Sequence, residues 1–509
     1  MHHIDVLRQI YQGRRWILAA DVLAAAPAHL AALARVGVND MNDVFVVAGS
    51  QGTGPAPADV RTVVLGITAD DLMSALHAFD DVIGDLPADV LAQVDAFDPD
   101  RRAAVIAPLF SQRSTAAGRP VWGARPASWR ALEDKTVVDE VWLAAGVPQA
   151  PAVVVPADPS SLRAAAAAMD AGDGTAWVAD NRQGWHGGAT GLRWVRTDEQ
   201  ASAAAAFMAG RADRVRVMPF LDGVPCSIHG IVLPDGTRAL RPCEMVVLRR
   251  PGHSELCYAG VASTWDPPTD DRDRMRAYAR RVGDHLHAAL GCRGAFSIDG
   301  IMTADGFRPT ELNPRFGAAL GLLSAAVEVP LYLLHLAVVE DVAADWRGAD
   351  LERMIVTAAD AAREVRCHVV VDRPVGDHII GLRGVDGGMC PTDDPDAEVT
   401  VHCGPAAIGG SYGWRSRRAS CRPGRWSRRW SRARSHGPRN TSTSVSARSR
   451  PHRTSVGRSR GPGRATTGGG ASGPARGGRV RTSVRRPPPG SGRWRQPPCA
   501  AWPPAGSGW

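Results

Sequence analysis

The stretch that decides the fold is residues 294–315, GAFSIDGIMTADGFRPTELNPR. Two runs rich in apolar side chains, 296–302 and 307–312, flank the short segment 304–306 (Ala-Asp-Gly). Glycine at the end of such a segment is typical of a three-residue hairpin turn, because glycine accepts left-handed backbone geometry. The stretch therefore predicts two antiparallel strands joined by a tight turn.

The pairing of these two strands decides what the hairpin can bind. If Thr303 pairs with Phe307, then Asp299 lies opposite Glu311, and Asn313 lies two residues farther along on the same face. Two carboxylates and an amide oxygen are ligands suited to Mg²⁺ beside nucleotide phosphates. Like charges directly opposite each other are unfavourable unless a cation intervenes. A metal site is therefore favoured over the alternative, a solvated hairpin face whose acids pair with nearby arginines.

Two basic residues add to this site. Arg315 directly follows the hairpin and could contact a transferring phosphoryl group. Lys135 is the only lysine in a chain that otherwise uses arginine, which indicates a position requiring a compact ammonium group, such as a phosphate contact. We predict that it lies at the start of a helix capped by Asp134 and closed by Gly146, where backbone N–H groups also attract anions. The alternative is a chance survivor on a solvated helix end.

A glycine-rich segment lies between two apolar strands predicted at 175–179 and 192–195. It reads GWHGGATG and contains Gly184, Gly187, Gly188 and Gly191. Such a loop can close its backbone N–H groups over phosphates and act as a lid. The alternative is a long surface loop.

The first 115 residues alternate apolar runs with helical segments. Strands are predicted at 16–20 and 44–48 with an Ala-rich helix at 22–35 between them, and 63–67 and 103–107 continue the pattern. This order is typical of a βαβ domain with a parallel sheet.

The loop GSQGTG at 49–54 follows the second of these strands. A glycine-rich loop at the carboxyl end of a strand could cradle a phosphate, but glycine turns are common and no acidic partner supports that reading. We favour an ordinary turn or a substrate loop.

Further elements and candidates lie along the rest of the chain. The pattern predicts a strand at 152–155, a helix at 161–169, two strands around a turn in 215–233, a helix at 272–290 and a strand-rich region at 365–403. Glu244 could assist the metal or contact substrate, or it could pair with Arg249 or Arg250. The other substrate-side candidates are His229, Arg249, Arg250 and His253.

The composition changes abruptly near residue 413. Residues 413–509 contain 23 Arg but no Asp, Glu or Lys, and they lack Leu, Ile, Met, Phe and Tyr. Such a segment cannot form a hydrophobic core. It could be a disordered arm for nucleic acid, but a shifted reading frame of a GC-rich gene explains the composition better, so we do not expect a nucleic-acid partner.

No stretch has the roughly 18 apolar residues of a membrane span, and the N-terminal residues do not resemble a secretory signal. The nine cysteines are irregularly spaced and include no C-x-x-C pair, which indicates neither a disulfide framework nor a zinc site. We therefore expect a cytoplasmic protein without a membrane partner.

In this order, the motifs resemble those of the ATP-grasp superfamily of ligases. The resemblance rests on the Lys135 segment, the loop 184–191, the segment Phe220-Leu221-Asp222-Gly223, and the sequence from Asp299 to Arg315. It implies that Asp299, Glu311 and Asn313 bind Mg²⁺ (or Mn²⁺). It further implies that Lys135 and the loop glycines bind ATP phosphates, and that the backbone of Phe220 and Leu221 meets adenine.

The resemblance also implies a fold and a function. The expected fold is α+β, with an α/β pre-ATP-grasp domain at 1–115, an ATP-grasp domain at 116–412 (small lobe about 130–215, large lobe about 216–412) and the low-complexity tail at 413–509. The expected activity is ATP- and magnesium-dependent, peptide-like ligation of a small carboxylate to an amine through an acyl-phosphate, with Arg315 and Lys135 as catalytic residues. A homodimer is one assembly to be considered.

Two departures from the family pattern keep alternatives open. The strand before the glycine-rich loop ends in Ala179-Asp180-Asn181 without the usual second lysine, so Arg182 is the candidate substitute. The connector lacks the usual acids beside adenine and ribose. The alternatives are another ATP-grasp chemistry, such as phosphorylation or carboxylation, and a nucleotide-binding protein with weakened or lost catalysis.

Overall fold

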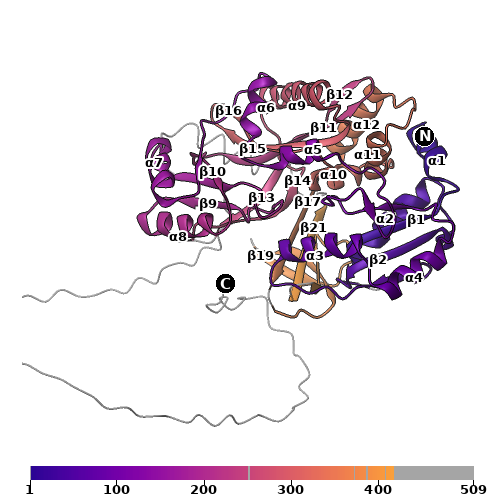
Figure 1. The fold of residues 1–509 in the computed structure, drawn as a ribbon. Coiled ribbons are helices and arrows are strands. Elements are labelled where there is room, and N and C mark those ends of the chain that lie inside the picture. Colours follow the sequence, from indigo (N-terminus) through magenta and orange to yellow (C-terminus); the bar gives the residue numbers. More distant parts are fainter. Residues whose placement is uncertain are drawn as a thin grey trace, which may run out of the picture. The chain divides into compact units, whose positions relative to one another are not determined.

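The computed structural model describes residues 2–54, 56–249, 253–371, 373–385, 388–406 and 409–417. Within them lie a parallel sheet, a small antiparallel sheet and a large antiparallel sheet, each accompanied by helices (Figure 1). The predicted α+β class is confirmed. The predicted tail lies outside the described residues from 418 onward; its first residues belong to strand β21 (Gly409–Arg417), which continues past the predicted boundary at 412.

The N-terminal sheet is parallel, with the strand order β3-β2-β1-β4. Its strands are β1 (Trp16–Val22), β2 (Val44–Ser50), β3 (Arg61–Val64) and β4 (Ala104–Ile106). The accompanying helices are α1 (His2–Tyr11), η1 (Leu23–Ala25), α2 (Ala26–Arg35), η2 (Met41–Asp43), α3 (Leu72–Gly84) and α4 (Ala88–Phe97). All residues of β2 are buried, as expected for a parallel sheet covered on both faces. The predicted βαβ arrangement is confirmed.

A short region connects this domain to the two lobes. It contains β5 (Thr115–Ala116), β6 (Arg119–Pro120), α5 (Ala127–Arg130), η3 (Ala131–Glu133) and α6 (Val138–Ala144). The predicted start of the helix is wrong. Asp134 accepts a hydrogen bond from Thr136 N in a turn, and α6 begins only at Val138 without a side-chain cap. The predicted helix end is correct, because Gly146 has φ of +64° and Val147 N donates back to Trp142 O.

The small lobe is built on a four-stranded antiparallel sheet in the order β7-β10-β8-β9. Its strands are β7 (Val153–Pro156), β8 (Thr175–Ala179), β9 (Leu192–Val195) and β10 (Arg214–Pro219). Helices α7 (Pro159–Met169) and α8 (Asp198–Ala209) pack on this sheet mainly through alanines, together with Leu162 and Met208. The glycine-rich loop connects β8 to β9, as predicted.

The large lobe contains the strand order β16-β15-β11-β13-β14-β17-β21-β20-β18-β19, with β12 paired to β11. Its strands are β11 (Val224–Leu233), β12 (Gly236–Ala239), β13 (Cys243–Arg249), β14 (Leu256–Ala262), β15 (Gly294–Thr303), β16 (Gly306–Asn313), β17 (Glu364–Val371), β18 (His378–Val385), β19 (Gly388–Thr392), β20 (Val399–Ala406) and β21. Its helices are α9 (Thr269–Leu290), α10 (Ala318–Ser324), α11 (Leu331–Val339) and α12 (Gly348–Ala361). The two strands predicted in 215–233 exist, but they belong to different sheets, so the segment between them connects the lobes.

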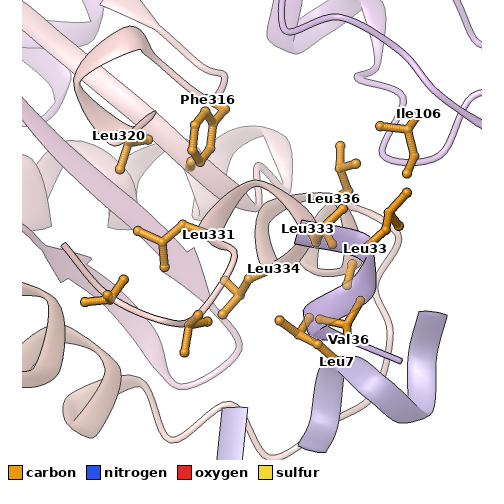
Figure 2. Packing of buried hydrophobic residues seen from close by; sticks show 14 of the residues in the cluster. Leu7, Leu33, Val36, Ile106, Phe316, Leu320, Leu331, Leu333, Leu334 and Leu336 are labelled. Atoms are coloured by element: carbon orange, nitrogen blue, oxygen red, sulfur yellow. The ribbon is translucent and has the colours of Figure 1, made fainter. Parts of the chain in front are cut away.

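Two hydrophobic cores cover the two faces of the large sheet. On one face, Cys226 and Ile228 of β11 pack with α9. On the other, Ile231 and Leu233 pack with α10, α11 and the N-terminal helices. Figure 2 shows side chains from the N-terminal helices and from α11 in this second core. The first domain and the large lobe therefore share one core. No helix in the described part of the chain combines the length and apolar character needed to cross a bilayer.

Candidate active site

The β15–β16 hairpin has a different turn from the predicted one but presents the predicted pair. Thr303 pairs with Gly306 rather than with Phe307, so the turn is one residue shorter than predicted. The register then shifts by one residue beside Asp299, and Asp299 lies opposite Glu311. A β-bulge inserts one extra residue into a strand, and here it compensates for the shorter turn.

Asp299 receives hydrogen bonds from both neighbouring strands. Ser227 on β11 donates from Oγ to Asp299 Oδ1 at 2.5 Å, and Asn313 on β16 donates from Nδ2 to Oδ2 at 3.1 Å. Burial and, next, the facing Glu311 carboxylate raise the pKa of Asp299 to about 6. A bound cation would offset both effects, so this pair is chemically suited to a metal ion.

Arg315 is held beside the hairpin by a buried ionic cluster. Its Nη2 donates to Asn313 Oδ1 at 3.0 Å, and its Nε lies 3.2 Å from Glu133 Oε1. Glu133 also pairs with Arg125 and is almost completely buried. Burial opposes ionisation of Glu133, but the guanidinium groups of Arg315 and Arg125 outweigh it and lower its pKa. The Glu133 carboxylate thereby orients Arg315 next to the candidate metal ligands.

Lys135 connects the hairpin to the glycine-rich loop. Its Nζ lies 3.3 Å from Glu311 Oε1 and donates to the His186 carbonyl at 3.0 Å. Its side chain is only 7% exposed, and these two partners compensate for the loss of water around its Nζ. Lys135 does not begin a helix, contrary to prediction, because the chain forms a turn between η3 and α6. Its place in the site follows from contacts with Glu311 and the loop instead of from a helix end.

The glycine-rich loop at 184–191 folds back over this lysine. Gly184 and Gly188 adopt φ of +90° and +62°, a region that favours glycine. A Cβ at Gly191 would lie only 2.4 Å from the His186 ring. The glycine spacing therefore permits both the reversal of the loop and the close packing of a buried imidazole beneath it.

The imidazole of His186 fixes the base of the loop. Its Nε2 lies 3.1 Å from the Ala179 carbonyl at the end of β8. Burial and, next, the Lys135 ammonium lower the pKa of His186 to about 4, so the ring is neutral at pH 7. The inward turn of the His186 ring was not predicted, because a histidine in a glycine-rich loop is equally compatible with a solvated position.

The tip of the loop contacts the N-terminal domain. The Trp185 ring stacks on Phe110 with centroids 5.2 Å apart and meets His77 of α3 edge-on at 4.6 Å. The His77 Nε2 also lies 2.9 Å from the Trp185 carbonyl oxygen. We refer to Trp185, His77 and Phe110 as the loop clasp. These contacts attach the loop to the N-terminal domain.

Replacing Trp185 by Ala should loosen the loop without unfolding the protein. Aromatic pairs contribute about 0.5–1.5 kcal/mol each beyond the area they bury, and this ring makes two. We expect amide hydrogen exchange within 184–191 to accelerate by about tenfold or more, measured by mass spectrometry. Trp265→Ala, in a partly buried tryptophan of another core, is the control. Unchanged exchange in Trp185→Ala would show that the clasp does not hold the loop.

Known proteins resemble this chain in sequence or in fold. No family model matches the sequence. A curated relative, the phosphoribosylamine–glycine ligase of Streptomyces coelicolor, is 28% identical over 367 residues, which cover 67% of this chain and 83% of the relative. Among solved structures, the biotin carboxylase domain of Hydrogenobacter thermophilus 2-oxoglutarate carboxylase has a TM-score of 0.51 at 14% identity, covering 83% of this chain and 89% of that one.

Rhizobium etli pyruvate carboxylase also has a TM-score of 0.51, at 17% identity, and the match covers 82% of this chain and 37% of the carboxylase. The similarity to these proteins extends over most of this chain. The predicted ATP-grasp fold is thereby confirmed. The predicted class, an ATP-dependent ligase that forms a C–N bond, agrees with the name of the Streptomyces relative.

The segment 220–223 connects β10 of the small lobe to β11 of the large lobe. It contains Phe220 and Leu221, which are both partly buried. The Phe220 ring stacks on Trp194 of β9 with centroids 4.0 Å apart. Arg196 and Arg249 lie over the Trp194 ring, at 4.1 and 4.4 Å from its centroid. The connector is thus anchored to the small lobe, and contact of Phe220 and Leu221 with a nucleotide stays a prediction.

Arg182, the candidate substitute for the second ATP-grasp lysine, is exposed, and its ion-pair partner is Asp213 at 3.3 Å. The structure does not pair it with the hairpin. A different cation, Arg216 on β10, is completely buried and binds Asp139 through two hydrogen bonds of 2.6 and 2.7 Å. Its Nη1 lies 3.5 Å from the Thr310 carbonyl of the hairpin. The position of Arg216 between two valines of a buried strand is the sequence feature that could have indicated this residue.

The other residues predicted to contact substrate differ in burial and in their partners. His229 is buried, with Nε2 3.5 Å from Ser227 Oγ, and burial lowers its pKa to about 3. His253 is exposed near Glu255, at 3.8 Å. Arg249 contacts Trp194 rather than Glu244, and Arg250 lies outside the described residues. His229 therefore supports the strand that carries Ser227.

Replacing Glu244 by Gln should stabilise the protein at alkaline pH. Burial raises the pKa of Glu244 from its ordinary value of 4.5 to about 7. The folded state then binds more protons than the unfolded state between these values, so the wild type loses stability as pH rises through them. We expect the free energy of unfolding of the variant to exceed that of the wild type by about 1–2 kcal/mol at pH 8, with little difference at pH 5. Urea denaturation at both pH values tests this, and equal stability at pH 8 would contradict it.

The candidate metal ligands are few, and they fit Mg²⁺. Among the described residues, no three or more His, Cys, Asp or Glu side chains gather in an arrangement that could hold a metal ion. The hairpin offers two carboxylates and Asn313, whose amide oxygen now accepts from Arg315. Rotation of the Asn313 amide by about 180° would exchange its oxygen and nitrogen, so that the oxygen would point to the side of Asp299 and could bind the same cation. Oxygen ligands that leave positions for phosphates and water are typical of Mg²⁺ sites.

Proposed function

We propose that the protein is an ATP- and magnesium-dependent ligase that joins a small carboxylic acid to an amine through an acyl-phosphate. The observation that carries the proposal is the ion pair between Lys135 and Glu311. It brings the glycine-rich loop, the only lysine and the facing carboxylates of the hairpin into one site.

Two of the similar proteins support this chemistry. The Streptomyces relative is named as a ligase of phosphoribosylamine and glycine, an amine and a carboxylic acid. The Hydrogenobacter biotin carboxylase domain was solved in complex with MgADP and bicarbonate. We infer that ATP and Mg²⁺ are used here as well, and that the substrates are small molecules.

In the proposed mechanism, Asp299, Glu311 and Asn313 would hold Mg²⁺, which neutralises phosphate charge when bound. Lys135, released from Glu311 by the incoming phosphates, would bind them through its ammonium group. A substrate carboxylate oxygen attacks the γ-phosphorus, ADP leaves, and an acyl-phosphate forms. Arg315, already oriented by Glu133, donates hydrogen bonds to the transferring phosphoryl group.

In the second step, the amine nitrogen attacks the acyl carbon. The C–O bond to phosphate breaks, inorganic phosphate leaves, and the nitrogen loses a proton to give the amide. The closed loop at 184–191 excludes water, which would otherwise hydrolyse the acyl-phosphate.

A panel assay tests the proposal. ADP release is followed with ATP and Mg²⁺ in the presence of amino acids, short peptides and other small acids, each with and without an amine acceptor. We expect ADP release to require both substrates, and mass spectrometry to detect an amide whose mass equals the sum of acid and amine minus water. Stoichiometric ADP release that yields a phosphorylated or carboxylated product instead would support another ATP-grasp chemistry.

A second candidate function is nucleotide binding without turnover. The structural observation that favours it is the absence of a lysine at the end of β8, where Ala179 is followed by Asp180. Asp180 instead accepts hydrogen bonds from the backbone of Asp213 and Arg214. Magnesium-dependent ATP binding by calorimetry, without ADP release across the whole panel, would support this candidate and reject the ligase.

A further inference from the structure

A cavity of about 330 Å³ lies between the N-terminal sheet and the last strands of the large lobe. One wall is formed by the carboxyl ends of β1 and β2 and by α3, and the other by β17, β20 and β21. Figure 1 shows α3 beside β21. Its volume falls in the range of small-molecule sites, and the carboxyl ends of parallel strands are a common place for such sites.

The loop that follows β2 shapes this cavity. Gly49 lies on its wall, and a Cβ there would meet Asp21 O at 2.7 Å and the Phe79 ring at 2.9 Å. Gly52 has φ of +70°. The glycines at 49–54, for which the sequence predicted a turn or a substrate loop, thus keep the backbone close to the cavity.

The lining is mainly apolar but contains two polar side chains that the structure leaves without a counter-charge or a hydrogen-bond partner, respectively Asp21 and Ser50. Leu72, Leu76 and Phe79 of α3 provide much of the apolar surface. Ser50 is about nine-tenths buried, and its Oγ has no hydrogen-bond partner. Burial raises the pKa of the Asp21 carboxyl group, hydrogen bonds from the backbone of Val22 and of Asp21 itself oppose this shift, and Asp21 forms no ion pair among the described residues. Buried polar groups normally find partners, so the unpaired Ser50 hydroxyl, together with a carboxylate that lacks a counter-charge, indicates a polar ligand.

The charges around the cavity select the chemistry of that ligand. Among the described lining residues, Asp21 is the only carboxylate and there is no arginine or lysine. Burial lowers the pKa of His368 on the opposite wall, so its ring is uncharged at pH 7. An anionic ligand would face Asp21 without a counter-charge, and a neutral hydrocarbon would leave the Asp21 carboxylate without a counter-charge and Ser50 Oγ without a partner. An ammonium group satisfies the carboxylate and can donate a further hydrogen bond.

The cavity is separate from the candidate active site. His368 lies on β17 and Asp299 on β15, with β11, β13 and β14 between them. Four strand spacings of about 4.8 Å each give roughly 19 Å. A small ligand in the cavity therefore cannot contact the hairpin carboxylates.

We infer that this cavity is a second binding site, for a small apolar molecule with a primary ammonium group. The apolar part of the ligand packs against α3 and β17, the ammonium group pairs with the Asp21 carboxylate, and Ser50 Oγ accepts a second N–H. The inference concerns binding alone, so it stands or fails independently of the proposed ligase activity.

Calorimetry on the full chain with three probes of similar shape tests the inference. The probes are 2-phenylethylamine, 2-phenylethanol and phenylacetate, which differ in charge at pH 7.5. We expect the amine to bind at least about tenfold more tightly than the alcohol, and phenylacetate to show no saturable binding. Saturating MgADP should leave the affinity for the amine within about twofold, because the two sites do not overlap.

Two variants locate the site. Asp21→Asn keeps the side-chain shape and should reduce the preference for the amine over the alcohol to less than about threefold, whereas Asp70→Asn, at an exposed acid nearby, should not change it. Ala75→Phe, at a cavity-lining position, should abolish binding of both probes at an unchanged melting temperature. If Ala75→Phe fails to fold, Asp21→Asn alone decides. Equal affinities of amine and alcohol, an unchanged preference in Asp21→Asn, or no saturation by about 10 mM amine would overturn the inference.

Discussion

Replacing Glu311 by Gln should lower substrate-dependent ADP release by at least about a hundredfold. The variant loses one of the two facing carboxylates of the hairpin and the anionic partner of Lys135. The neutral amide cannot balance the charge of a bound cation, so we also expect weaker magnesium-dependent binding of ADP. Initial rates at saturating ATP and a magnesium titration measure both effects.

Glu328→Gln is the matched control, because Glu328 is exposed and lies outside the hairpin. It should retain ADP release within about twofold of the wild type. Circular dichroism and the melting temperature of Glu311→Gln show whether its fold is intact. Full activity of a folded Glu311→Gln protein would refute the assignment of Glu311 as a metal ligand.

Replacing Glu133 by Gln should cost about 3–5 kcal/mol of stability, the largest stability effect expected for a single residue of the site. Glu133 is 4% exposed and lies between Arg125 and Arg315. Without its charge, two guanidinium groups face each other in a buried place. Because the pKa of Glu133 is lowered in the folded state, the stabilisation is present above pH 4.5 and is lost as pH falls through the lowered value.

Urea denaturation at pH 7 measures this loss. Glu140→Gln, at an exposed glutamate on α6, provides the control and should change the unfolding free energy by less than about 0.5 kcal/mol. The folded fraction of Glu133→Gln should also release ADP more slowly, since Arg315 loses the carboxylate that orients it. A variant as stable as the wild type would mean that Glu133 is not ionised in the folded protein.

The hairpin shows why part of the site was predictable. With the predicted three-residue turn, alternation along the strands places Asp299 and Glu311 on one face, where the repulsion between them favours a bound cation. The turn itself was mispredicted, because a two-residue turn and a bulge place the same pair opposite each other as a three-residue turn does. The sequence pattern indicates which side chains share a face of the hairpin. It does not distinguish a three-residue turn from a shorter turn followed by a bulge, because both place the same side chains on that face.

The remaining features depend on contacts between distant segments. Trp185 meets His77 across 108 positions of the chain, and Glu133 reaches Arg315 from a different element. The pairing of Arg216 with Asp139 and the cavity beside Asp21 likewise arise only when separate elements pack together. No local pattern encodes such contacts, since each partner alone is compatible with a solvated surface. Lys135 is intermediate: its rarity indicated a role, whereas its helix position was wrong.

Helix α3 belongs to two of the features described above. His77 lies in the loop clasp, while Leu76 and Phe79 line the cavity. Thermodynamic linkage makes any coupling through this helix reciprocal: if a cavity ligand changes the affinity for ATP by some factor, ATP changes the affinity for that ligand by the same factor. Measuring either binding constant with and without the other ligand yields the coupling free energy, and the expected change of less than about twofold means that α3 transmits less than about 0.4 kcal/mol between the two sites.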